Sequence, residues 1–116
     1  MSAIKLRPNN EDVETYRPND MSWEMLGYLH QELGVCYEVK SYVEEDCSKP
    51  SALAELNEWQ AKLVVKKIDG FGFDRCRKLH ERLEKEGKMK AELKVFWLWV
   101  LEWGKWLEKS GGYIRD

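Results

Sequence analysis

The sequence has few of the residues that usually mark a metal site, a disulfide framework or a catalytic centre. It contains two histidines and three cysteines, and Cys36, Cys47 and Cys76 form no CxxC pair. An odd, scattered set of cysteines is typical of reduced and packed thiols, and the two histidines complete no zinc spacing. We therefore expect no bound metal ion, no cofactor and no disulfide.

Long apolar runs and an excess of one charge are also absent. The longest uninterrupted apolar run, Val95–Leu101, is far shorter than the ~20 residues that span a bilayer. The first residues lack the apolar core of a signal peptide. A formal net charge of -2 argues against bulk attraction to nucleic acid or anionic lipid. These absences favour a soluble cytoplasmic protein with no membrane partner.

What remains is the composition of a single globular domain. Hydrophobic residues make up 43% of the chain and charged residues 34%, a balance that disfavours disorder. The length of 116 residues allows one core but not two. No repeat or linker divides residues 1–116, so we expect one mainly α domain, a compact bundle of about four helices. Two X-Pro steps predict an irregular N-terminal arm over residues 1–19.

Cap residues and apolar spacing predict where the four helices lie. Asn19, Asp20 or Ser22 can cap the first helix, and Gly34 can end it. A second helix is expected over residues 51–68 after the turn at 44–51. A third would start at Asp74 and end at Gly87, and the last would run from about residue 88 to residue 109.

The segment "VCYEVKSYVE" (35–44) fits two kinds of structure. Its valines and tyrosine alternate with a period of two, which favours a short β element. The same residues could continue a helix. A strand here would need a partner, and only "AIKL" (3–6) offers one, so the choice stays open.

The most distinctive segment is "KVFWLWVLEWGKW" (94–106), which has four tryptophans. At about 100° per residue, one broad face carries the ordinary core stripe, comprising Leu93, Phe96, Trp97, Val100, Trp103, Gly104 and Leu107. Val95, Trp99 and Trp106 lie on an adjacent flank, and Leu98 lies nearly opposite the core. Apolar residues therefore surround most of this helix, which is the pattern of a helix covered on more than one side.

Two interpretations of this helix remain open. It can be the central helix of the bundle, or its flank can stay exposed and bind another protein or a second copy of the chain, since tryptophans dominate many interfaces. An interfacial membrane helix would need a basic polar face, and here the charges are mixed. The candidate protein-binding residues are Val95, Leu98, Trp99, Trp103 and Trp106.

Residues 68–79, "IDGFGFDRCRKL", resemble the helix-hairpin-helix motif of DNA-binding proteins. Ile68, Gly70, Phe71, Gly72, Cys76 and Leu79 occupy the motif positions. The resemblance implies that backbone N–H groups of the glycine turn hold a nucleic-acid phosphate. The residues it implies are Lys66, Lys67, Gly70, Gly72, Arg75, Arg77 and Lys78. The alternative is a tight interhelical turn with Asp74 as N-cap and with Phe71 and Phe73 in the core.

No residue set predicts catalysis. His80-Glu81 lacks the second histidine of a metalloprotease helix, and no phosphate-binding loop occurs. We therefore expect a non-enzymatic regulatory or inhibitor-type protein that binds another protein, or itself, through its tryptophan-rich C-terminal helix. By analogy of size and character, such proteins are common in phages and other mobile elements. The alternative is a nucleic-acid-binding module that uses the glycine turn.

Overall fold

The computed structural model describes residues 4–34 and 55–115. In this part of the chain the order of elements is β1 (Leu6–Pro8), α1 (Asp20–Leu33), β2 (Glu55–Leu56), α3 (Glu58–Lys85), α4 (Leu93–Ser110) and β3 (Tyr113–Arg115). The mainly α prediction is confirmed, but the described residues form three helices and a small sheet instead of about four helices. The strand-or-helix question at 35–44 and the turn at 44–51 lie outside the described residues.

The helix α1 has the ends that the sequence predicts. The side chain of Asn19 accepts a hydrogen bond from the Ser22 backbone N–H at 2.7 Å, which caps the first turn. Gly34 ends the helix with a left-handed backbone, at φ 72°. Met25, Leu26, Leu29 and Leu33 are buried, so α1 packs its apolar side onto the core.

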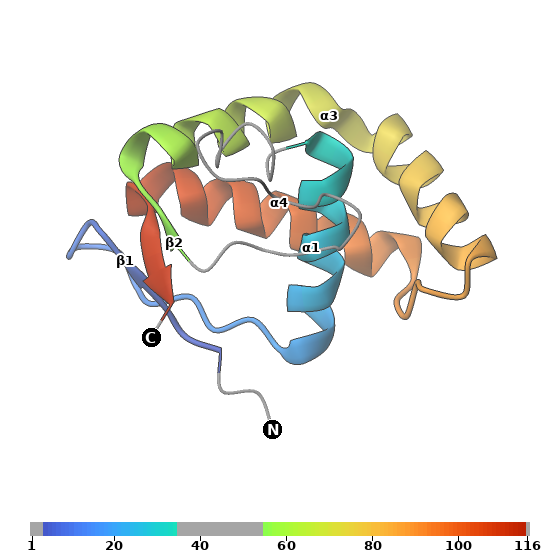
Figure 1. Cartoon of the computed structure of the whole chain (residues 1–116), viewed down its shortest axis with the longest axis horizontal. Helices are drawn as coiled ribbons and strands as arrows, with labels where there is room; N and C mark the ends of the chain where they lie inside the picture. The colour runs from blue at the N-terminus through green and yellow to red at the C-terminus, as the bar shows by residue number, and fades with distance from the viewer. Residues whose placement is uncertain (1–3, 35–54, 116) are drawn as a thin grey trace.

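The helix α3 replaces two predicted helices. It begins at Glu58 and not near residue 51, because Asn57 and Gln60 form a reciprocal capping box. It continues through Gly70 and Phe71, and the "DGFGF" segment produces only a kink. At the kink, Gly72 has φ 71° and ψ 164°, a conformation that is essentially restricted to glycine. The chain changes direction there and runs on to Lys85 (Figure 1).

A three-stranded antiparallel sheet of order β1-β3-β2 joins the two ends of the described chain. The strand β1 pairs with the C-terminal strand β3. The pairing of "AIKL" with residues 35–44, left open from the sequence, involves residues outside those described. Figure 1 shows β1 and β3 side by side near the chain termini. Leu6, Leu56 and Tyr113 are buried beneath the sheet.

The helix α4 starts at Leu93, five residues later than predicted from residue 88, and Gly111 ends it with φ 67°. The helix α3 arches over one side of α4, and α1 crosses in front of it (Figure 1). Gly104 allows the α3 approach: a Cβ placed on it would lie 3.3 Å from Ile68 Cγ2. Four members of the predicted core stripe are completely or almost completely buried, namely Phe96, Val100, Trp103 and Leu107.

Candidate functional site: the outer face of α4

The tryptophans of α4 have different environments. Trp103 is fully buried, and its indole Nε1–H donates to His30 Nε2 at 3.0 Å. Trp106 is half-buried: its Nε1–H donates to the backbone oxygen of Glu14 at 2.8 Å, and its ring packs on Tyr16 and stacks on Trp103. Both indoles are therefore used inside the domain. Trp103 cannot contact a partner in this conformation, and most of the predicted flank at Trp106 is covered by the N-terminal arm.

The neighbouring residues of α4 remain accessible. Val95, Leu98 and Leu101 have exposed fractions of 37%, 46% and 37%. They are spaced three residues apart, so their side chains adjoin on the helix surface. This surface, which we call the α4 outer face, also includes half-buried Trp97 and Trp99, which lie on its two sides.

Phe73 extends the α4 outer face onto α3. Its ring meets Trp97 edge-on with centroids 5.4 Å apart, and it is 48% exposed. The expectation that Phe73 folds into the core is therefore wrong, whereas Phe71 is buried as expected. The kink at Gly72 explains the difference, because it turns the next residue toward Trp97 near the start of α4. Sequence reasoning missed Phe73 and Leu101 as surface residues, although Leu101 lies one turn after the predicted Leu98. It also assigned Trp97 to the core stripe, whereas Trp97 is only half-buried.

Buried contacts hold α4 in place beneath this face. His30 is completely buried, and burial lowers its pKa to about 4. Because its Nε2 accepts from Trp103, the neutral ring carries its proton on Nδ1, which has no hydrogen-bond partner in the structure. His80 Nε2 lies 2.8 Å from the backbone oxygen of Ala91 and ties α3 to the segment that leads into α4. Both histidines thus serve the fold.

The glycine turn of α3 does not present a free cluster of cations. Arg77 Nη2 lies 2.8 Å from Asp74 Oδ1, and Arg77 Nη1 lies 3.0 Å from Glu81 Oε1. Lys78 also pairs with Asp74, and the Arg75 guanidinium lies over the Phe71 ring at 5.1 Å. Side-chain hydrogen bonding to Arg77, with the nearby positive charges, lowers the pKa of Asp74. Asp74 therefore binds these cations and does not start a separate helix as predicted.

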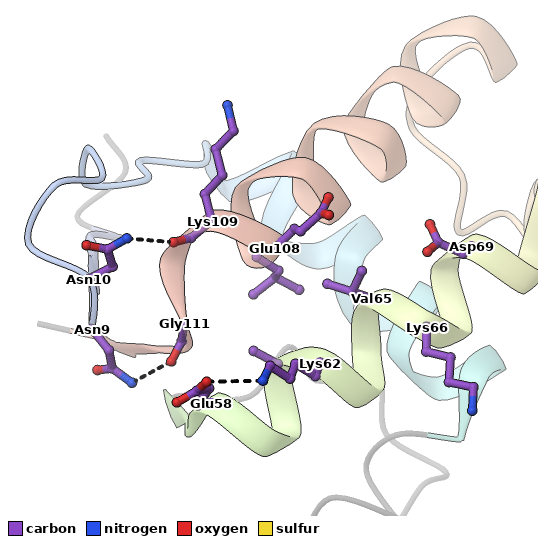
Figure 2. Close-up of a pocket in the computed structure, with 12 residues that line it drawn as sticks. Asn9, Asn10, Glu58, Lys62, Val65, Lys66, Asp69, Glu108, Lys109 and Gly111 are labelled. Atoms are coloured by element: carbon purple, nitrogen blue, oxygen red, sulfur yellow. Dashed lines mark hydrogen bonds and ion pairs between the residues drawn. The ribbon is translucent and has the colours of Figure 1, made fainter.

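A groove of mixed polar and apolar lining lies between the first half of α3 and the end of α4 (Figure 2). Its volume is about 710 Å³, and Ala61, Val65 and Leu107 contribute its apolar lining. Much of its polar rim is already occupied: Glu58 pairs with Lys62 at 3.1 Å, and the Asn9 amide donates to the Gly111 oxygen at 3.0 Å. The described residues that line it include no histidine, cysteine, serine or tyrosine, and its titratable groups are the carboxylates and lysines of Glu58, Lys62, Lys66, Asp69, Glu108 and Lys109.

The structure also bears on three other features considered from the sequence: the cysteine thiol, a metal site and a membrane-spanning helix. Cys76 is a buried free thiol, and burial raises its pKa to about 11, which makes it a poor nucleophile. Within residues 4–34 and 55–115, no three histidine, cysteine or acidic side chains are grouped so that they could hold a metal ion. In the same ranges, no helix has the length and apolar character needed to cross a membrane.

Comparisons of the chain with models of protein families, with curated proteins and with solved structures give no match. Function must therefore be argued from the residues themselves.

Proposed function

We propose that this chain is a non-enzymatic protein of the regulatory or inhibitor type, that it works in the cytoplasm, and that it binds another protein through the α4 outer face. The observation that carries the proposal is the exposed row of Val95, Leu98 and Leu101 on a helix whose opposite side forms the core. Single exposed apolar residues are ordinary, but an adjoining set bordered by aromatic rings is typical of contact surfaces.

Burial of the apolar side chains of the α4 outer face by a partner is expected to be favourable in free energy. Removing apolar surface from water contributes about 25 cal/mol per Å², and aromatic side chains at the centre of an interface contribute most of the binding energy. Trp97, Trp99 and Phe73 supply such rings beside the aliphatic row. The buried Trp103–His30 contact anchors α4 in the core, and a helix that is already formed lowers the entropic cost of association.

The proposal modifies the set of contact residues predicted from sequence. Val95, Leu98 and Trp99 stay in it, and Leu101, Trp97 and Phe73 join it. Trp103 and Trp106 support the face from within, because their indoles are bonded to His30 and Glu14. Their substitution would damage the fold and would not report on binding alone.

Photo-crosslinking tests this proposal directly. A photoreactive residue at position 98 should form a crosslink to a defined partner in cells that express the chain naturally. The matched control is position 21 on α1, because Met21 is exposed to a similar degree, 41% against 46% for Leu98. Crosslinks at position 98 and not at position 21 support the proposal. Equal crosslinking at both positions, or none at position 98, contradicts it.

A second candidate function is nucleic-acid binding at the α3 kink. It is favoured by the positive φ of Gly72, which gives the glycine pattern a real backbone turn. It ranks below protein binding because Arg77 and Lys78 are already paired with carboxylates. A labelled DNA or RNA oligonucleotide should shift at low salt and lose binding on Arg75→Glu. Absence of any shift at low salt excludes this function.

A further inference from the structure

Two lysines bracket the apolar row of the α4 outer face. Lys94, Leu98, Leu101 and Lys105 follow one another at intervals of four, three and four residues, so they form one line along the helix. At 1.5 Å per residue the two lysines stand roughly 16 Å apart along the axis. Both are exposed. The line therefore presents a cation, two leucines and a second cation.

Neither lysine is neutralised within the described residues. The ion pairs there engage other lysines and arginines, for example Lys90 with Glu24 at 3.1 Å and Lys88 with Glu86 at 2.9 Å. Glu102 and Glu108 lie three residues to either side of Lys105 but form no ion pair with it. Glu102 follows Leu98 by four residues and adjoins the line, and burial and then its charge raise the pKa of Tyr16 in the N-terminal arm to about 12. Glu108 lines the groove between α3 and the end of α4.

This arrangement of charge disfavours a second copy as the occupant. In an antiparallel pair with Leu98 of one copy against Leu101 of the other, Lys94 would face Lys105. In a parallel pair each lysine would face its own equivalent. Both arrangements bring like charges together at the two ends of the apolar contact, and such juxtaposition is costly at an interface.

We infer that the α4 outer face accepts an acidic amphipathic helix of another protein, with apolar residues against Leu98 and Leu101 and with Asp or Glu side chains against Lys94 and Lys105. This inference rests on the proposed function and specifies the chemistry of its partner. A helix laid along α4 would place carboxylates about 11 residues apart at the two lysines, with aliphatic or aromatic anchors at helical spacing between them.

Selection from a peptide library tests the inference. The probe is a displayed library of alanine-based helical peptides with one randomised face, selected on the full chain and counter-selected on Leu98→Asp. The expected binders carry apolar residues flanked by Asp or Glu. The variant Lys94→Glu/Lys105→Glu should weaken them about tenfold or more and should prefer peptides whose acids are changed to lysine. The charge-matched control Lys66→Glu/Lys85→Glu should leave binding unchanged.

The other outcomes contradict the inference in different ways. Binders that need Leu98 but show no acidic preference would retain the docking face and refute the acidic partner. If no peptide distinguishes wild type from Leu98→Asp, both the inference and the proposed function fail. Sedimentation showing a dimer that Leu98→Asp dissociates would identify a second copy as the occupant. Binding to vesicles rich in anionic lipid that Leu98→Asp abolishes would identify a membrane surface instead.

Discussion

The contact between His30 and Trp103 shows how one pair of side chains fixes the position of α4. Both residues are fully buried, and the indole N–H donates to the imidazole Nε2 at 3.0 Å. Four further aromatic rings surround or adjoin this indole, from Tyr16, Trp23, Trp106 and Tyr113. A neutral imidazole fits this apolar setting, whereas a charged one would be buried without a counter-ion.

The buried histidine should make the protein sensitive to acid. The pKa of His30 is about 4 in the folded state against 6.5 when unfolded, so the unfolded state takes up the proton first. Stability is therefore fully present above about pH 6.5 and falls as pH drops toward 4, with His30 contributing a loss of about 3 kcal/mol between pH 7 and pH 4. Urea unfolding at several pH values measures this.

The variant His30→Gln provides the control for that measurement, because a glutamine oxygen can still accept from Trp103 and does not titrate. The acid sensitivity due to carboxylates should persist in the variant, and the part due to His30 should disappear. Parallel stability curves for wild type and His30→Gln would contradict this role of the histidine.

Residue patterns in the sequence predict the core of α4 well and its flank poorly. The 100° spacing correctly identifies Phe96, Val100, Trp103 and Leu107 as buried, because helical periodicity alone decides which side faces the core. The partial burial of Trp106 depends on its contacts with Glu14 and Tyr16, which lie near the other end of the sequence. No local pattern encodes that contact, so its burial could not be predicted.

The kink in α3 illustrates how one glycine of a pair controls an element. Gly72 has φ 71° and ψ 164°, whereas Gly70 lies in regular helix, and a Cβ added to it would have open space around it. The glycine pattern in the sequence does predict a change of direction here. It does not reveal that the first glycine stays inside the helix, and this is why two expected helices form one bent α3.

Alanine substitutions at these glycines should have opposite effects. Gly70→Ala should stabilise the protein by about 0.5–1 kcal/mol, because alanine favours a helix interior. Gly72→Ala should destabilise it by about 1–3 kcal/mol, since the backbone there suits only glycine. Thermal or denaturant unfolding of the two variants checks the pair. A similar effect of both substitutions would show that the kink is not imposed at Gly72.

Element boundaries are predictable where a cap lies next to a clear apolar repeat. Asn19 and Gly34 mark α1 correctly for this reason. The next described helix, α3, starts at Glu58 and not near residue 51, because the capping box of Asn57 and Gln60 sets its start. The strand β3 could not be predicted, since three residues after Gly111 and Gly112 show no recognisable period.

The whole domain is closed by contacts between its two ends, and Gly112 lies where they meet. Asn9 and Asn10 donate side-chain hydrogen bonds to the Gly111 and Lys109 oxygens. A Cβ on Gly112 would lie 2.3 Å from the Leu56 oxygen and 2.7 Å from Asn9 Nδ2. This single position therefore brings together the N-terminal arm, the start of α3 and the C-terminal strand.

Gly112→Ala should disrupt the packing of the N-terminal arm, the start of α3 and the C-terminal strand against one another. A methyl group cannot fit without moving the Leu56 backbone, and φ of 100° is itself unfavourable for alanine. We expect a loss of about 3 kcal/mol or more in the free energy of unfolding, measured by denaturant titration. Gly34→Ala, which also has positive φ but open space around its Cβ position, should cost less. An equal cost for both would mean that the close approach at Gly112 contributes nothing.

At the level of the complete molecule, the domain buries one side of α4 and leaves the α4 outer face in solvent. Partner binding and folding should therefore depend on different residues of one helix. Core residues such as Phe96 should be needed for folding, whereas Leu98 and Leu101 should be needed for binding.

The most direct test measures both properties for Leu98→Asp, with Met21→Asp as the control. We expect Leu98→Asp to change the free energy of unfolding by no more than about 0.5 kcal/mol, as is usual for an exposed site, and to abolish binding of the crosslinked partner. Met21→Asp should leave both unchanged. Full retention of partner binding by folded Leu98→Asp would contradict the claim that this face is the docking surface.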